Sequence, residues 1–265
     1  MTTSNPVADA FDTFNIARLQ SPTLERIWRT AYGQQYGAEA RPNAFYTQAV
    51  LDEIVSKVAL CIDNSSSAPL LDVGCGHGLV GRYIAGLLGC SLVGVDISPK
   101  SIDLARRLSQ EKPSESREVQ FFVGNAASSI ELSGGSCQAV VCLDVLLYFP
   151  DKLAALREMA RVLKPGGLFA FTSWEAQGFN ERIGAQQIED YRPLIKEAGM
   201  EIQTYEALAQ ASEMQLAFFN EAPRHIAQLE EEMGIDPATN FLNMVAAASR
   251  EAPNRRYVLG VARRL

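Results

Sequence analysis

Residues 70–81 read LLDVGCGHGLVG, an apolar segment that contains Asp72 and is followed by glycines at 74, 76, 78 and 81. Glycine permits a tight turn and lets a ligand approach the backbone N–H groups closely, so this segment predicts a strand that turns into a helix around a bound molecule. Two glycine patterns fit. GHGLVG is the GxGxxG pattern of dinucleotide sites, whereas GCGHG is a GxGxG pattern that begins directly after the strand.

Asp72 favours the second pattern. The strand LLDV ends at Val73, so Gly74 is expected to be the first residue of the turn. A carboxylate at this strand end would repel a pyrophosphate, but it would attract a ligand that carries an ammonium or sulfonium group. A nicotinamide-dependent reductase that uses the GxGxxG pattern is the alternative.

Asp96 closes the next predicted strand, SLVGVD, about twenty residues beyond the loop, where a carboxylate commonly binds ribose hydroxyls. Its alternative role is to cap the following helix, although Ser98 alone would supply that cap. The ligand is therefore expected to contain a ribose.

The pattern around the loop predicts a doubly wound α/β fold, because short apolar segments alternate with helical ones. The predicted strands are LLDV, SLVGVD, VQFFVG, AVVCLD, LFAFTSW, MEIQTYEAL and RRYVLGVARR. We expect a seven-stranded, mostly parallel, Rossmann-like sheet that binds its ligand at the carboxyl ends of the strands. A late helix is expected near Ala185–Glu197, before the sixth strand.

Helical patterns flank this core. Residues 1–64 are expected to form an N-terminal helical cap, with helices around Ser21–Tyr32 and from Pro42 onward. Residues 65–265 are expected to form the ligand-binding catalytic domain. A helical insertion at about 208–250 would form a lid over the crevice at the strand ends.

Composition excludes several classes of partner. The net charge of −7 provides no basic field for nucleic acid, and no apolar run approaches the length of a membrane span. The N-terminus lacks the regions of a signal peptide, so a cytoplasmic protein is expected. The five cysteines include no CxxC pair, which predicts reduced, buried thiols, and no metal site is expected.

The segment from Pro69 to Trp174 resembles class I S-adenosylmethionine-dependent methyltransferases. The resemblance lies in LLDVGCGHG, VGVDIS, VGNAA, VVCLDVLLYF and RVLKPGGLFAFTSW. It implies S-adenosylmethionine as cofactor and S-adenosylhomocysteine as product. The residues that it places at the methionine part of the cofactor are Asp72, Gly74, Cys75 and Gly76.

The resemblance also assigns the rest of the cofactor site. It implies that Asp96 binds both ribose hydroxyls and that Ile97 packs against the adenine. The residues that it places along the adenine edge and beneath the reactive end are Asn125, Ala126, Leu143 and Asp144. The family often has aspartate at the Asn125 position, but the asparagine carbonyl oxygen also accepts a hydrogen bond from the adenine amine.

Tyr32 and Tyr36 are four residues apart in AYGQQYG. If the preceding helix continues, their rings share a face, and they are expected to cover the cofactor while their hydroxyls bind its carboxylate. The alternative is an aromatic patch that docks the N-terminal helices on the core.

The sequence after the fourth strand favours a small acceptor. DVLLYF is apolar and aromatic, unlike the Asn-Pro-Pro-Tyr type sequence of many nucleic-acid and protein-amide N-methyltransferases of this superfamily. We expect methyl transfer to an oxygen, nitrogen or carbon atom of a small molecule, with a role in secondary-metabolite biosynthesis. His225, Asp144 and Tyr148 are the candidate catalytic residues, a base being optional because an amine attacks without one. A non-methylating reaction on the same fold, such as a cyclisation, is the alternative, and the oligomeric state stays open.

Overall fold

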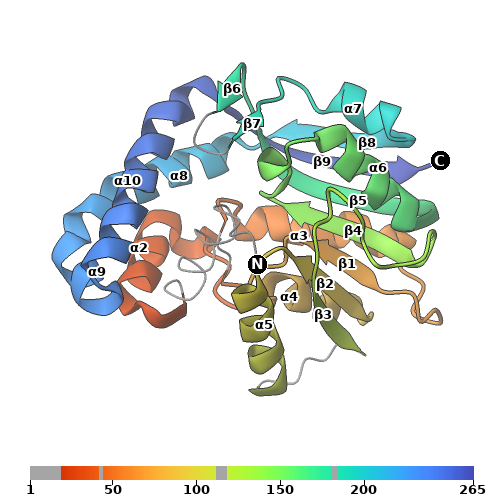
Figure 1. Cartoon of the computed structure of the whole chain (residues 1–265), viewed down its shortest axis with the longest axis horizontal. Helices are drawn as coiled ribbons and strands as arrows, with labels where there is room; N and C mark the ends of the chain where they lie inside the picture. The colour runs from red at the N-terminus through yellow and green to blue at the C-terminus, as the bar shows by residue number, and fades with distance from the viewer. Residues whose placement is uncertain (1–18, 42–43, 112–117, 181–183) are drawn as a thin grey trace, which may run out of the picture.

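The computed structural model describes residues 19–41, 44–111, 118–180 and 184–265. Its centre is a seven-stranded sheet in the order β3-β2-β1-β4-β5-β9-β8 (Figure 1). Strands β1 to β5 pair in parallel, and β9 is antiparallel to both β5 and β8. The strands are β1 (Leu70–Val73), β2 (Leu92–Asp96), β3 (Val119–Val123), β4 (Cys137–Leu143), β5 (Leu163–Glu175), β8 (Met200–Ala207) and β9 (Arg256–Arg264). The predicted seven-stranded, mostly parallel sheet is confirmed.

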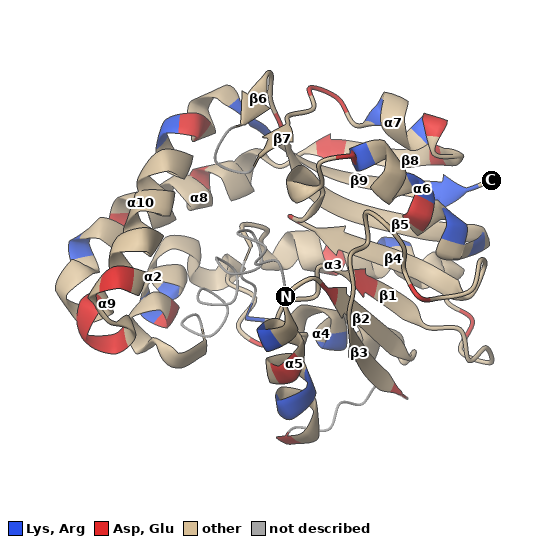
Figure 2. Cartoon of the chain, in the orientation of Figure 1, with Lys and Arg blue, Asp and Glu red and all other residues tan. Residues whose placement is uncertain are grey.

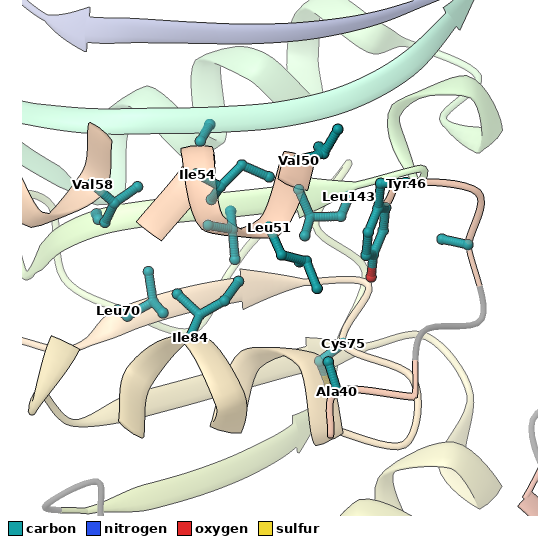
Figure 3. Close-up of a cluster of buried hydrophobic side chains, with 14 of the residues drawn as sticks. Ala40, Tyr46, Val50, Leu51, Ile54, Val58, Leu70, Cys75, Ile84 and Leu143 are labelled. Carbon is teal, nitrogen blue, oxygen red and sulfur yellow. The ribbon is translucent and has the colours of Figure 1, made fainter. Parts of the chain in front are cut away.

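Helices cover both faces of the sheet, because successive strand residues point to opposite sides. Leu70 of β1 packs into one hydrophobic core, part of which is shown in Figure 3, and Leu71 packs into the other. The first core contains side chains of α3 (Gln48–Val58), α4 (Leu79–Leu88) and α5 (Pro99–Glu111), and the second contains those of α6 (Lys152–Val162) and α7 (Arg192–Glu197). The carboxyl end of β1 is therefore held in a layer that is packed on both sides.

A lobe of helices lies at the carboxyl ends of the parallel strands (Figure 1). It consists of α2 (Pro22–Tyr32), α8 (Ala209–Glu221), α9 (Ile226–Met233) and α10 (Ile235–Glu251), the last three inserted between β8 and β9. The ring of Trp28 on α2 lies 4.4 Å from the ring of Phe218 on α8, measured between centroids. Glu232 of α9 accepts hydrogen bonds from the backbone N–H and the hydroxyl of Thr23 at 3.1 and 2.7 Å. The lobe thus joins an N-terminal helix to the late insertion through a core of its own.

Two expectations about helices differ from the structure. The sequence predicts one helical cap over residues 1–64. In the structure the two helices described in this range pack in different places, because α2 packs in the lobe and α3 packs against the sheet. The helix expected near Ala185–Glu197 begins only at Arg192. Before it, the short strand β7 (Ala185–Gln186) pairs antiparallel with β6 (Phe179–Asn180).

Charged side chains are distributed over the sheet layer and the lobe, with a group of acidic residues on α9 (Figure 2). Within the described ranges, no helix is long and apolar enough to cross a membrane. The five cysteines are free, and all except the half-buried Cys61 are buried, as the sequence predicts.

Candidate functional site

The glycine loop begins directly after β1. Gly74, Gly76 and Gly78 have φ angles of +73°, +52° and +77°, in the left-handed region that favours glycine. Gly78 is the N-cap residue of α4, and the Gly74 N–H donates to the Val95 carbonyl oxygen at 2.8 Å. The loop backbone thus follows the GxGxG pattern, with Gly74 as the first residue of the turn, as expected.

Asp96 is half-buried at the end of β2 and turns toward this loop. Its Oδ2 accepts a hydrogen bond from the Gly76 N–H at 2.8 Å, and its Oδ1 accepts one from the Ser98 N–H at 2.9 Å. The Ser98 hydroxyl in turn accepts from the Ser101 N–H at 2.9 Å, so Ser98 supplies a cap for α5. Asp96 is therefore not needed as the helix cap. Ile97 follows it and is half-buried.

Asp72 lies beneath the loop. Its side chain is 4% exposed and packs against the first turn of α4, where a Cβ at Gly81 would lie 2.4 Å from Asp72 Oδ2. Burial and the neighbouring charge of Asp96 raise the pKa of the Asp72 carboxyl to about 7, against a hydrogen bond from the Gly81 backbone. Cys75 is also buried, and burial raises the pKa of its thiol. From this buried position the Asp72 carboxylate could attract a cationic ligand through its charge, without a direct contact.

The segment after β3 contains the predicted adenine residues. Asn125 is exposed, and Ala126 is buried behind it. The Asn125 Oδ1 accepts from the Ala127 N–H at 3.0 Å, and its backbone oxygen accepts from the Ser128 hydroxyl at 3.1 Å. Because a carbonyl oxygen has two lone pairs, Oδ1 retains one for an adenine amine.

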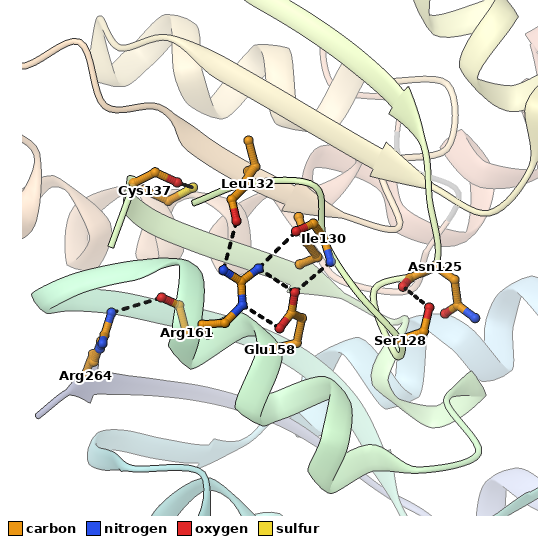
Figure 4. A network of polar contacts seen from close by, with 9 residues as sticks. Asn125, Ser128, Ile130, Leu132, Cys137, Glu158, Arg161 and Arg264 are labelled. Carbon is orange, nitrogen blue, oxygen red and sulfur yellow. Dashed lines mark hydrogen bonds and ion pairs between the residues drawn. The ribbon is translucent and has the colours of Figure 1, made fainter. Parts of the chain in front are cut away.

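Two side chains of α6 hold the backbone of this segment in place (Figure 4). Glu158 accepts from the Ile130 N–H at 2.7 Å, and Arg161 donates to the Leu132 and Ile130 carbonyl oxygens at 2.9 and 3.0 Å. The hydrogen bond from Arg161 is the largest of the causes that lower the pKa of the Glu158 carboxyl. Both charges therefore act as a clamp on the backbone that follows Asn125.

Asp144 follows Leu143 at the end of β4 and has a φ of +59°. Its Oδ1 accepts from the hydroxyls of Thr172 and Tyr257, each at 2.7 Å, and its Oδ2 accepts from the Phe45 N–H at 3.0 Å. Burial raises the pKa of the Asp144 carboxyl, and these three donors oppose the shift. The carboxylate at this strand end is therefore already engaged on both oxygens.

The other residues predicted from the sequence are spread over the molecule. His225 lies in the turn between α8 and α9, and its Nε2 is 2.9 Å from Glu221 Oε1. Tyr148 is half-buried in the short helical turn Leu146–Tyr148 after β4. Tyr148 thus lies in the segment that follows Asp144 after β4, whereas His225 lies in the lobe, between α8 and α9. A catalytic role for each of the three candidates stays a prediction.

Tyr32 and Tyr36 do not share a helical face. The helix α2 ends at Tyr32, because Gly33 has a φ of +51° and a turn follows. The Tyr32 hydroxyl donates to the Phe45 carbonyl oxygen at 3.0 Å, and the Tyr36 hydroxyl donates to Glu25 at 2.7 Å. Both rings pack in the core of the lobe, which supports the alternative of an aromatic docking patch.

Tyr46 is a buried tyrosine near the strand ends that the sequence analysis does not single out. This tyrosine is 3% exposed and packs in the same core as Cys75 and Leu143 (Figure 3). It precedes Thr47, the N-cap of α3, whose hydroxyl accepts from the Val50 N–H. In sequence this position indicates only a hydrophobic contact with the helix that follows.

Comparison with known proteins identifies the class of this core. Residues 71–171 match the family model described as a methyltransferase domain. Together with the sheet order and the glycine loop, the match shows that this part of the chain is a class I methyltransferase domain, as the sequence predicts.

Particular relatives extend the comparison. The chain is 37% identical over 144 residues to the ubiquinone biosynthesis O-methyltransferase of Xanthomonas campestris pv. campestris, covering 54% of each protein. It is 28% identical over 156 residues to methyltransferase GfsG of Streptomyces halstedii, covering 58% of this chain and 55% of GfsG. The chain thus spans about half the length of these curated relatives. The solved [4+2]-cyclase SpnF is 25% identical, with a TM-score of 0.67 and 80% of each chain covered.

Proposed function

We propose that this protein transfers a methyl group from S-adenosylmethionine to a small-molecule acceptor. The observation that carries the proposal is the glycine loop, whose three left-handed glycines place Gly76 N–H against the carboxylate of Asp96. The similarity to two named methyltransferases supports the same reaction. S-adenosylmethionine supplies the activated methyl group when it is bound.

The donor set of the site fits this cofactor. Asp96 stands at the end of β2, where it would bind the ribose hydroxyls, and Asn125 at the end of β3 would bind the adenine edge. Asp72 and Asp144 give the ends of β1 and β4 a negative potential that would stabilise the ammonium and sulfonium groups. A phosphate-rich dinucleotide would be repelled by the same charges.

The acceptor site would lie between the strand ends and the lobe formed by α2, α8, α9 and α10. Methyl transfer from a sulfonium is an in-line displacement, so the chain must align the acceptor and exclude water. A lobe that faces the carboxyl ends of the strands supports this role. We propose a small organic acceptor of secondary metabolism, and the cytoplasmic location expected from the sequence stays a prediction.

Calorimetric titration with S-adenosylmethionine, S-adenosylhomocysteine and NAD in parallel tests the cofactor. Binding of both adenosyl ligands without NAD is the expected result, and binding of NAD alone would overturn the proposal. Methyl transfer is then tested by incubation with methyl-labelled cofactor and a panel of small phenols, amines and carbon acids.

A second function is favoured by the similarity to the [4+2]-cyclase SpnF. In that case the bound cofactor would shape the pocket without losing its methyl group. Turnover of a substrate while the S-adenosylmethionine concentration stays constant would establish this alternative, whereas stoichiometric formation of S-adenosylhomocysteine would exclude it.

The binding of S-adenosylhomocysteine is expected to tighten as the pH rises from about 6 to about 8. In the free protein, burial raises the pKa of Asp72 to about 7. The ligand ammonium favours the carboxylate form, so binding lowers this pKa and releases a proton. The dissociation constant should fall by at most about tenfold per pH unit below the pKa and level off above it.

Calorimetry in buffers of different ionisation enthalpy measures the released proton directly. Asp72→Asn should bind with a flatter pH profile and without that proton release. An identical pH profile in the wild type and in Asp72→Asn would contradict the assignment to Asp72.

A further inference from the structure

Phe45 is a point at which the helical lobe meets the sheet. Its ring packs against the core of the lobe and against the first core of the sheet. The rings of Trp28 on α2 and Phe219 on α8 each lie 5.4 Å from the Phe45 ring, measured between centroids. The Phe45 carbonyl oxygen accepts a hydrogen bond from the hydroxyl of Tyr32 at the end of α2, at 3.0 Å. Both the ring and the backbone of Phe45 are therefore bound to the lobe.

On the sheet side, the Phe45 N–H donates to Asp144 Oδ2 at 3.0 Å. The sheet fixes the orientation of Asp144, because its backbone N–H donates to the Thr172 carbonyl oxygen at 3.0 Å. Its carboxylate also accepts from the hydroxyls of Thr172 on β5 and Tyr257 on β9, each at 2.7 Å. A carboxylate held by the sheet thus holds a residue of the lobe in turn.

The inserted helices are attached to the sheet at their own two ends. α8 begins just after β8, α10 is followed closely by β9, and β8 pairs with β9. At this place the Leu208 N–H donates to the Tyr257 carbonyl oxygen at 2.8 Å, and Ala211 packs in the first core of the sheet. The Phe45–Asp144 hydrogen bond joins a different part of the lobe, the α2 side, to the end of β4. Loss of this bond would leave the lobe attached at the ends of β8 and β9.

The charge of Asp144 has no cationic partner in residues 19–41, 44–111, 118–180 and 184–265, since no Lys, Arg or His side chain there forms an ion pair with it. Burial raises the pKa of its carboxyl, and the hydrogen bonds oppose the shift. A cation brought close would favour the carboxylate, whereas the neutral acid is a weaker acceptor for the Phe45 N–H. The titratable groups around Asp144, whose pKa values burial and then nearby carboxylate charge raise, are Tyr32, Tyr46, Cys142 and Tyr257.

The order of the strands indicates that the charged sulfur of the cofactor would lie toward Asp144. In the proposed function Asn125, after β3, binds adenine, and Asp96 on β2 binds ribose. The sulfur is bonded to the ribose through C5′, and the next strands in the sheet are β1 and β4. When the methyl group leaves with the acceptor, the sulfur keeps the bonding electron pair and becomes a neutral thioether. The reaction therefore removes a positive charge from the neighbourhood of Asp144.

We propose that the Phe45–Asp144 hydrogen bond holds the lobe over the strand ends, and that the positive charge at the methyl-donor position of the cofactor strengthens this bond. The lobe is held while the methyl group is on the sulfur, and it loosens after transfer so that the product can leave. Asp144 is a positioning residue in this mechanism. The inference rests on the proposed function for the identity of the ligand.

The test compares two ligands that differ in charge at that position. Sinefungin has an ammonium group there, and S-adenosylhomocysteine has a neutral sulfur. At saturation, hydrogen–deuterium exchange of the Phe45 amide and of the α8 amides should be about fivefold to tenfold slower with sinefungin, as expected when a neutral acceptor becomes charged. In Asp144→Asn the two complexes should exchange equally. Equal exchange in the two wild-type complexes, or an undiminished difference in Asp144→Asn, would overturn the inference.

Asp151→Asn is the matched control, because the Asp151 carboxylate also accepts a backbone N–H, that of Ala154 at 2.9 Å, but at the start of α6. It should keep the wild-type difference between the ligands, and loss of that difference would contradict the assignment to Asp144. If Asp144→Asn fails to fold, Tyr257→Phe keeps the charge and removes one hydroxyl donor from it. The acid form is then favoured further when no cation is bound, so the ratio of exchange rates between the two complexes should widen, and an unchanged ratio would contradict the proposal.

The same experiment separates this inference from the proposed function. Failure of the wild type to bind either ligand would overturn the proposed function and this inference with it. Binding of both ligands with the wrong exchange pattern would overturn only the role of the Phe45–Asp144 hydrogen bond.

Discussion

Asp96→Ala is expected to weaken the binding of S-adenosylhomocysteine by at least about 100-fold. In the proposed complex the carboxylate would accept hydrogen bonds from both ribose hydroxyls, and each hydrogen bond to a charged group contributes about 1.5–3 kcal/mol. Alanine also removes the acceptor of the Gly76 N–H, which is 2.8 Å from Asp96 Oδ2. Calorimetric titration of the variant measures the loss.

Two further variants separate binding from folding. Asp96→Asn keeps one oxygen acceptor without the charge, so its affinity should lie between those of the wild type and the alanine variant. Asp103→Ala removes an exposed carboxylate from α5, where Asp103 pairs with Arg106 at 3.7 Å, and should bind as the wild type does. If Asp96→Ala kept wild-type affinity while remaining folded, the ribose assignment would be wrong.

The features that the sequence predicted correctly depend on neighbouring residues in the chain. LLDV is apolar except for Asp72, and all four of its residues are buried, as for a strand covered on both faces. Gly74 could be identified as the first residue of the turn from two local facts. The strand ends at Val73, and glycine is the residue that tolerates the positive φ found at position 74. Ser98 likewise caps the adjacent helix through a contact three residues away.

The features that the sequence did not predict depend on contacts between distant segments. The Phe45 N–H and the Asp144 carboxylate are 99 residues apart in the chain, and neither residue type indicates the pairing. Tyr46 therefore appears in sequence as a packing residue, although its hydroxyl lies among the strand ends. The helix patterns of α2 and α3 are both amphipathic, and such a pattern does not say which surface the apolar face contacts.

A single glycine decided the outcome for Tyr32 and Tyr36. The expected shared face requires that the helix continue through both residues, but the chain takes a positive φ at Gly33. That glycine is part of AYGQQYG, and a glycine near the end of a helix is a common termination signal. The correct boundary was therefore accessible from the sequence, whereas the partners of the two hydroxyls were not.

Gly74→Ala is expected to lower the free energy of unfolding by about 2–5 kcal/mol and to abolish measurable cofactor binding. The residue has a φ of +73°, which costs an alanine about 1–2 kcal/mol. A Cβ there would also lie 2.4 Å from Val145 Cγ2, so the loop or the end of β4 must shift. Either shift would move the backbone N–H groups that face the ligand. Denaturant unfolding and calorimetry measure the two effects.

Gly166→Ala is the matched control, because Gly166 has a φ of +77° but a Cβ there would meet no atom within 4 Å. It should show the cost of the positive φ alone, about 1–2 kcal/mol, and bind the cofactor normally. Val145→Ala in the Gly74→Ala background removes both methyl groups from the clash and should restore part of the lost stability. Equal losses for Gly74→Ala and Gly166→Ala would show that the contact with Val145 does not constrain the loop. The requirement for glycine at position 74 would then be a matter of backbone conformation only.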